Sequence, residues 1–358
     1  MAFISVQLKG FRNLQEQKID LAYPEVFLLG QNGQGKTNLL EALYILAYGT
    51  SFRTKSDSEI YTHGMPFFSV SGEYRENEHI FHSIHIRSQS KKKEITKNGK
   101  RITDRKILIN TIPCIIFCHD DIAFANGEMS YRRFFLDQTL SLYNTEYIDT
   151  MRRFTKILKM RNAILKEHRQ DLLDTIDIQF AETGLQIVEQ RAHLIDELNT
   201  FFTEHYRKIS EIENIHLEYK SSWPYHSVEE ILVYLKEHRL RDIELKTSLS
   251  GPQRDKVQYQ HDKTPFIPHA STGQIRLISL ILRSVQAQYY FEKTQRKPIL
   301  LLDDVLLELD PKKRVRFTEL LPVYEQLFCT FLPGEPFEHY KKQHTKIYHV
   351  ENGGFYNG

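Results

Sequence analysis

The sequence has few cysteines, no apolar run of membrane length and no large excess of charge. Its three cysteines, Cys114, Cys118 and Cys329, are an odd and sparse set in 358 residues, which argues against a disulfide framework and for a reducing compartment. No run approaches the ~20 apolar residues of a membrane helix. The N-terminal stretch MAFISVQLKGFRN lacks the charged start and long apolar core of a secretion signal. We therefore expect a cytoplasmic protein with no membrane partner.

The formal net charge is only +2, so a nucleic-acid surface could arise only from uneven placement of charge. Two stretches are rich in Lys and Arg, residues 87–106 and 152–169. A single run of this kind is usually a solvated face, but on a DNA-binding protein it would bind phosphates without reading base sequence. The first stretch holds nine basic residues against Glu94 and Asp104, namely Arg87, Lys91, Lys92, Lys93, Lys97, Lys100, Arg101, Arg105 and Lys106.

Glycine nearly vanishes between residues 130 and 244, where Gly184 is the only one. Arg, Lys, Glu, Leu and Ile recur there at helical spacing, which predicts long amphipathic helices. Strict heptads are absent from the pattern, so no long coiled coil is expected. The flanking parts read as strands and helices. We expect an α/β fold, a mixed sheet with flanking helices plus antiparallel strands, built from residues 1–125 and 246–358, with residues 126–245 as an inserted helical lobe.

Two local patterns refine this plan. The Asn98-Gly99 pair, between polar flanks, predicts a hairpin turn. The stretch IPCIIFCHD places Cys114 and Cys118 beside His119, which is too few ligands for a metal site and is more typical of a buried strand.

Glycines concentrate instead in GQNGQGKT, Gly30 to Thr37, which fits G-x-x-x-x-G-K-[ST] at every fixed position. An apolar run precedes it and a helical pattern that stops at Gly49 follows. Such glycines let backbone N–H groups turn toward phosphate oxygens, and the helix start favours the same anion. Lys36 would reach the β- and γ-phosphates, and the Thr37 hydroxyl would ligate Mg²⁺. The plain alternative is a glycine loop that merely joins a strand to a helix.

Two further patterns suit the same chemistry. LLLDD ends a buried strand with Asp303 and Asp304, where P-loop proteins hold Mg²⁺ and orient the attacking water, although adjacent acids can also be solvated loop residues. Ser271-Thr272-Gly273-Gln274 opens an apolar helix about 30 residues earlier. Its free N–H donors suit a second phosphate, although taken alone it is an ordinary N-cap.

With these motifs in this order, the chain resembles the RecF family, ABC-type ATPases of the chromosome-maintenance and DNA-repair branch. The resemblance spans nearly the whole chain and implies an ABC-type P-loop ATPase head with a short helical insertion. The segments that carry it are FRN at residues 11–13, GQNGQGKTNLLEALY, SFR at 51–53, NG…YRRFFLD at 126–137, LKMRNAIL at 158–165, SGPQRD at 250–255, STGQ and LLLDDVLLELD at 300–310.

The resemblance implies ATP and Mg²⁺ as cofactors and a head-to-tail homodimer that traps ATP between one P-loop and the other copy's STGQ segment. Lys36, Asp303 and Asp304 would be the catalytic residues, with Asp304 as general base, and Thr37 and Asp303 would hold the metal ion. The nucleotide would be bound by Gly30, Gln31, Asn32, Gly33, Gln34, Gly35, Lys36, Thr37, Asn38, Arg12, Asn13, Ser271, Gly273, Gln274 and Asp310.

The implied function is a weak, DNA-linked ATPase switch of recombinational repair and replication-fork maintenance. It would bind single- and double-stranded DNA without sequence specificity, associate with the nucleoid, and support recombinase loading at gaps with RecR and RecO. The chain departs from the family at Gln253 and Lys256, where a histidine and a second acid are usual, and Thr330 stands where transport ABC proteins have a histidine. A P-loop phosphotransferase and a nucleotide-binding scaffold without a DNA role are the alternatives.

Overall fold

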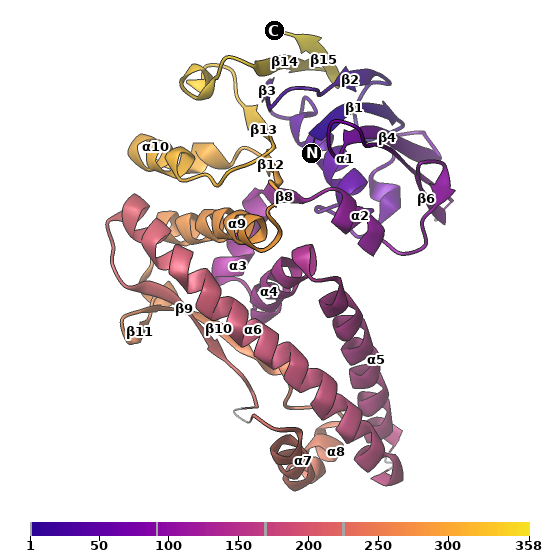
Figure 1. Cartoon of the computed structure of the whole chain (residues 1–358), viewed down its shortest axis with the longest axis vertical. Helices are drawn as coiled ribbons and strands as arrows, with labels where there is room; N and C mark the ends of the chain where they lie inside the picture. The colour runs from indigo at the N-terminus through magenta and orange to yellow at the C-terminus, as the bar shows by residue number, and fades with distance from the viewer. Residues whose placement is uncertain (1, 91, 168–169, 224–225) are drawn as a thin grey trace. The chain divides into compact units, whose positions relative to one another are not determined.

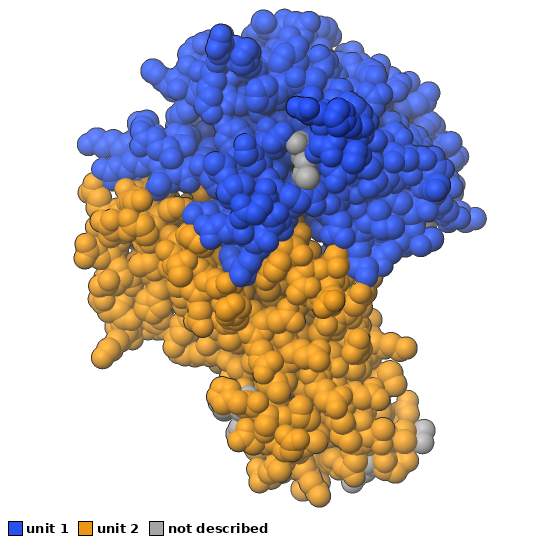
Figure 2. Space-filling model, in the orientation of Figure 1, with its two compact units in different colours: residues 1–120, 287–358 blue, residues 121–286 orange. Residues whose placement is uncertain are grey.

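The computed structural model describes residues 2–90, 92–167, 170–223 and 226–358 (Figure 1). The chain forms two compact units (Figure 2), unit 1 with residues 1–120 and 287–358 and unit 2 with residues 121–286. Residues 246–286 therefore group with the inserted part of the chain by their contacts. The division into domains at residues 126 and 245 stays a prediction. None of the described helices is long and apolar enough to cross a bilayer.

A six-stranded sheet at the centre of unit 1 positions the glycine-rich loop. Its strand β3 (Glu25–Leu29) is buried throughout and has parallel neighbours on both sides, as expected for continuous apolar runs in parallel sheets. Strands from both ends of the chain complete the sheet, as predicted. Its order is β15 (Gly354–Asn357), β14 (Thr345–Glu351), β3, β13 (Gln326–Phe331), β12 (Ile299–Leu302) and β8 (Cys114–Phe117), with only β15 antiparallel to its neighbour.

A second, antiparallel sheet completes unit 1. Its last turn joins β6 to β7 through Asn98 (φ 52°) and Gly99 (φ 75°), which confirms the predicted hairpin because a type I′ turn needs positive φ at both positions. Helix α1 (Lys36–Tyr48) shares one apolar core with both sheets. The sheet order is β2 (Lys18–Asp20), β1 (Ala2–Lys9), β4 (Phe67–Arg75), β5 (Phe81–Gln89), β6 (Lys92–Lys97) and β7 (Lys100–Arg101). Unit 1 also contains the helices α2 (Lys106–Thr111) and α10 (Pro311–Glu319).

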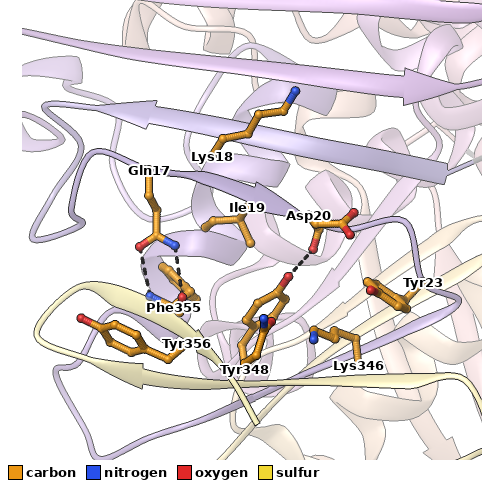
Figure 3. A pocket seen from close by; sticks show the side chains of 10 residues that line it. Gln17, Lys18, Ile19, Asp20, Tyr23, Lys346, Tyr348, Phe355 and Tyr356 are labelled. Atoms are coloured by element: carbon orange, nitrogen blue, oxygen red, sulfur yellow. Dashed lines mark hydrogen bonds between the residues drawn. The ribbon is translucent and has the colours of Figure 1, made fainter.

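The C-terminal hairpin β14–β15 is tied to β2 across a hollow of about 430 Å³ (Figure 3). The Gln17 side-chain amide donates to the Phe355 carbonyl and accepts from the Phe355 N–H. The Tyr348 hydroxyl donates to the Asp20 carbonyl at 2.7 Å. These bonds satisfy backbone groups at the sheet edge and hold the last hairpin of the chain against its first strands.

Unit 2 is built on two long helices that lie side by side (Figure 1), α5 (Thr145–Glu167) and α6 (Leu173–Ser210). The rings of Phe154 and Phe180 stack between them at 5.4 Å. Gly184 sits inside α6 because a Cβ there would lie 2.5 Å from the Trp223 ring. The other helices are α3 (Ile122–Asn126), α4 (Met129–Tyr143), α7 (Val228–Glu237), α8 (Arg239–Leu245) and α9 (Thr272–Thr294), which continues into unit 1.

The segment predicted to be helical also contains a strand, β9 (Ile215–Lys220), which the helical prediction missed. Its residues IHLEYK alternate in burial and pair antiparallel with β10 (Lys256–His261), which in turn pairs with β11 (Thr264–Pro265). The partner strand lies some 40 residues later in the chain, so the pairing is decided by tertiary contact and not by local periodicity.

Buried ion pairs join distant motifs inside unit 2. Arg191 on α6 pairs with Asp137 of the RRFFLD segment at 2.8 and 2.9 Å and donates to the Pro252 carbonyl at 2.8 Å. Arg133 of the same segment donates to the Asp255 carbonyl at 2.8 Å. The YRRFFLD and SGPQRD segments are therefore two sides of one polar cluster that supports the fold of this unit. Gln253, where the family usually has a histidine, donates to the nearby Ser250 carbonyl at 2.7 Å.

Candidate nucleotide-binding site

The glycine-rich loop runs from the end of β3 into α1, as predicted. Two of its glycines are required by close approach. A Cβ at Gly30 would lie 2.5 Å from the Val350 carbonyl oxygen, and one at Gly35, where φ is 119°, would lie 2.6 Å from the Leu14 side chain. A bare backbone therefore lets the C-terminal hairpin and the N-terminal segment pack against the loop.

The C-terminal hairpin also holds the loop by hydrogen bonds. The Gln34 side-chain oxygen accepts from the Asn352 N–H at 2.6 Å, and the Gly353 N–H donates to the Gln34 carbonyl at 3.0 Å. A hollow of about 600 Å³ opens beside this part of the loop, lined by Leu29, Gly30, Gln31, Gln34, Pro333, Gly334, Phe337, His349, Val350, Glu351 and Asn352.

The Lys36 side chain folds back into the glycine-rich loop that precedes it. Its ammonium donates to the carbonyls of Gly30 at 2.7 Å and Gln31 at 3.3 Å, and the residue is only 3% exposed. The glycine-rich turn therefore already concentrates positive charge where the sequence motif expects a phosphate group. An anion entering the loop would replace these carbonyls as the partner of Lys36.

The tertiary fold brings Thr37 and Asp303 together although they are 266 residues apart. The Thr37 hydroxyl donates to Asp303 Oδ1 at 2.7 Å. Burial raises the pKa of Asp303 to about 6, against the lowering effect of the Thr37 hydrogen bond. A hydroxyl beside a carboxylate is a donor set that suits Mg²⁺, which keeps the rest of its shell for water and phosphate oxygens. These two residues fit the predicted metal site.

Asp304 follows directly and has a left-handed backbone, with φ at 53°. Thr330 on the neighbouring strand β13 fixes it twice. The Asp304 N–H donates to Thr330 Oγ1, and the Thr330 hydroxyl donates to Asp304 Oδ1, both at 2.7 Å. Because Thr330 is buried, this pair holds the unusual backbone conformation and the carboxylate in one orientation.

Asn13 lies beside the loop and Arg12 beside the helix that follows it, and their contact with a nucleotide stays a prediction. Asn13 donates to the Gly33 carbonyl at 2.8 Å and accepts from the Asn38 side chain at 2.7 Å. Arg12 has a positive φ of 51° and pairs with Glu41 on α1. The predicted residue Asn38 is thus part of the same polar rim as FRN.

Asp310 belongs to unit 1 but has a local role there. It caps α10, accepting from the Lys313 N–H at 3.0 Å and pairing with the Lys313 ammonium at 2.9 Å. The hydrogen bonds from Lys313 lower the pKa of Asp310. Its predicted place at a dimer interface stays a prediction.

Ser271, Gly273 and Gln274 of the STGQ segment belong to unit 2, at the start of α9. Ser271 Oγ accepts from the Gln274 N–H at 3.3 Å, and Gln274 Oε1 accepts from the Ser271 N–H at 2.6 Å. This reciprocal arrangement is a capping box. A Cβ at Gly273 would meet no atom within 4 Å, so this glycine leaves the helix start open to a ligand.

Comparison with known proteins decides the family. The model of the RecF/RecN/SMC N terminal domain matches residues 3–355. The DNA replication and repair protein RecF of Treponema pallidum is 47% identical over 350 residues, covering 96% of this chain and 98% of that protein. The chain belongs to the RecF family. The RecF of Leptospira interrogans serogroup Icterohaemorrhagiae serovar Lai is 30% identical and covers 97% of the chain and 96% of its own length.

Solved structures agree with this assignment. The recombination mediator protein RecF–ATP of the RecFOR pathway superposes with a TM-score of 0.89 at 25% identity and covers 100% of this chain and 97% of its own. An Smc head domain from Pyrococcus furiosus, 15% identical with a TM-score of 0.59 over 99% of this chain and 95% of its own, shares the fold. The expected ABC-type ATPase head is therefore confirmed for this RecF-family chain.

Sequence reasoning did not single out Glu41 and Arg53, which the structure places next to Asn38. Arg53, in the SFR segment, donates to the Asn38 side chain at 2.8 Å and to Glu41 at 3.3 Å. A signal was present for Glu41, since it is the single acid in the apolar helix KTNLLEALYILAY and an isolated buried carboxylate needs a partner. No pattern in the neighbouring sequence identifies Arg12 or Arg53 as that partner.

Proposed function

We propose that this chain is an ATP-dependent DNA-binding protein of recombinational repair and replication-fork maintenance. ATP joins two copies head to tail on DNA, and slow hydrolysis releases them, which supports recombinase loading at gaps. The observation that carries the proposal is the contact of Thr37 with Asp303, because it unites the phosphate loop and the acidic strand end in one site with Asp304 beside them. The RecF names of the full-length relatives support the DNA role.

Each residue of this site has a distinct task in the proposal. Lys36 exchanges the Gly30 and Gln31 carbonyls for the β- and γ-phosphates. Thr37 and Asp303 hold Mg²⁺, which neutralises charge on the phosphate oxygens when bound. Asp304, oriented by Thr330, accepts a proton from the attacking water.

The second half of the site comes from a second copy. Ser271, Gly273 and Gln274 present a capped helix start, whose positive end favours an anion. In the proposed dimer this helix start meets the γ-phosphate held by Lys36 of the other copy, and Asp310 lies at the interface. RecR and RecO are the proposed partners, supported by the RecFOR pathway of the solved RecF–ATP structure.

Two basic regions, one in each unit, are the proposed DNA-binding surfaces. In unit 1 a hollow of about 380 Å³ is lined by Arg87, Lys92, Lys93 and Arg101, with Gln89, Ser90 and Glu94. Lys93 is engaged by Asp57 at 2.6 Å, whereas Arg87, Lys92 and Arg101 are exposed. Lys91 lies outside the described residues. In unit 2 the exposed face of α5 carries Arg152, Arg153, Lys156, Lys159 and Lys166.

Sedimentation with Mg²⁺ and a slowly hydrolysed ATP analogue tests the proposal. We expect a dimer for the wild type, loss of nucleotide binding for Lys36→Ala, and retained binding without dimerisation for Ser271→Ala. DNA affinity should rise with the analogue and fall steeply with salt. A wild type that binds ATP but stays monomeric would instead support a phosphotransferase, and DNA binding that ignores the nucleotide would overturn the clamp.

A further inference from the structure

Unit 1 holds a buried glutamate to which the chemistry proposed above gives no task. The Glu41 side chain, on α1, is 0% exposed. Arg12 donates to it twice, from Nε at 2.9 Å and Nη2 at 2.8 Å. The Ser51 hydroxyl donates at 2.5 Å and Arg53 Nη1 at 3.3 Å. One carboxylate therefore receives two arginines from two separate loops.

Each arginine side chain has a hydrogen-bond partner besides Glu41: Arg12 donates to the Glu59 carbonyl at 2.5 Å and Arg53 to the Asn38 side chain at 2.8 Å. Arg12 sits at a backbone position with φ of 51°, and its side chain is 19% exposed. The Arg53 side chain is 39% exposed. The shared buried carboxylate is the partner that the two side chains have in common, and it restricts the rotamers of both.

Arg53 is linked to the phosphate loop by the side-chain amides of Asn38 and Asn13. Arg53 Nη1 donates to the Asn38 side chain at 2.8 Å, Asn38 donates to Asn13 at 2.7 Å, and Asn13 donates to the Gly33 carbonyl at 2.8 Å. This chain of hydrogen bonds places Arg53 beside the part of the loop where the phosphates are proposed to bind.

The charges in this cluster do not cancel. Two guanidinium groups share one carboxylate, so one positive charge is left over. A guanidinium has five N–H donors, and both side-chain hydrogen bonds that Arg53 donates among the described residues come from Nη1. The excess charge and the remaining donors suit a phosphate group at the rim of the loop.

We propose that Glu41 is a positioning residue of the nucleotide site, which holds Arg12 and Arg53 together at the rim of the phosphate loop so that both meet the phosphates of ATP. This inference rests on the proposed function, because ATP is the ligand. Glu41 acts only through the two arginines. Removing the charge of Glu41 should therefore weaken nucleotide affinity as much as losing the contacts of both Arg12 and Arg53.

Binding of a fluorescent ATP analogue with Mg²⁺ tests this role. Glu41→Gln keeps the shape and one acceptor oxygen but removes the charge, so we expect affinity about 10- to 100-fold weaker, the range for lost charge-assisted hydrogen bonds. Glu59→Gln is the matched control, because the Glu59 side chain accepts from Thr54 while Arg12 contacts only its carbonyl. Its affinity should change by less than about twofold, as for an ordinary surface substitution.

A double variant separates positioning from general structural damage. Because Glu41 acts through Arg53, Glu41→Gln combined with Arg53→Gln should bind ATP no more than about twofold more weakly than Glu41→Gln alone, whereas independent losses would multiply. Unchanged affinity in Glu41→Gln, or fully multiplied losses in the double variant, overturns the inference. A wild type that binds no ATP would overturn the proposed function instead. If Glu41→Gln does not fold, Arg12→Gln and Arg53→Gln replace it, and their combined loss must be less than multiplicative.

Discussion

Replacing Arg161 by methionine gives a demanding test of the structure of unit 2. The Arg161 side chain is 0% exposed and donates to Asp177 and to Asp242, each at 2.7 Å. A third hydrogen bond reaches the Ser248 hydroxyl at 2.8 Å. Methionine has a similar length and no charge, so the substitution leaves two buried carboxylates that have lost their shared cation.

The size of the effect follows from this geometry. Removing one partner of a buried ion pair costs about 3–5 kcal/mol. We expect the lower part of that range, because Asp177 keeps Arg239 at 3.1 Å and Asp242 keeps the Leu249 N–H at 3.1 Å. With a urea dependence of about 2 kcal/mol per molar, the unfolding midpoint should fall by about 1.5 to 2 M.

The chain carries a convenient reporter for this measurement. Trp223 is its only tryptophan, it lies in unit 2, and its ring N–H donates to Ser250 at 2.9 Å in the buried core. Urea unfolding followed by tryptophan fluorescence therefore reports on unit 2. Arg152→Met is the matched control on the same helix, because its pair with Asp149 at 3.4 Å is about half exposed and contributes about 0–1 kcal/mol.

Two results would decide the matter. If Arg161→Met unfolds at the same urea concentration as Arg152→Met, the buried network does not exist as described. If Arg161→Met does not fold at all, adding Asp242→Asn and Asp177→Asn should restore folding, since it removes the unpaired charges. A triple variant that stays unfolded would refute the charge argument.

Three further predictions concern unit 1. Thr330→Val should lower kcat for ATP hydrolysis about 10- to 100-fold with KM little changed, because Asp304 loses its orienting hydrogen bond, and Thr330→Ser should restore most of it. Burial raises the pKa of Glu25, but the hydrogen bonds that it accepts, first the one from Lys342, outweigh burial and leave the pKa below 4.5. The ionised Glu25 therefore stabilises the folded state above pH 4.5, and this stabilisation is lost as the pH falls through the lower pKa of the folded protein. The melting-temperature gap between wild type and Glu25→Gln should therefore shrink below pH 4.5, and a gap independent of pH would contradict this. Changing Arg101 to Gln should weaken DNA binding equally for all sequences and reduce the salt slope by about one unit, and a loss confined to one sequence would speak against phosphate contact.

Local sequence determined much of this protein. The motif from Gly30 to Thr37 predicted a phosphate loop, and glycine is required by the close approach of the Val350 carbonyl at Gly30 and by the positive φ at Gly35. Apolar runs ending at the loop and at Asp303 predicted the buried strands β3 and β12, since parallel strands covered on both faces leave no alternation. The Asn98-Gly99 turn and the long helices of unit 2 followed from turn chemistry and helical spacing.

Tertiary structure alone decided which of these parts meet. The partners of Thr37, Gln34 and Glu41 are far away in the chain or in separate loops, and no local preference names a contact of that kind. The basic run on α5 likewise could not show that Arg161 turns inward to buried aspartates while Arg152 stays exposed. Residue spacing sets which face a side chain can occupy, but the free energy of burying a charge depends on the counter-charge that the fold brings to it.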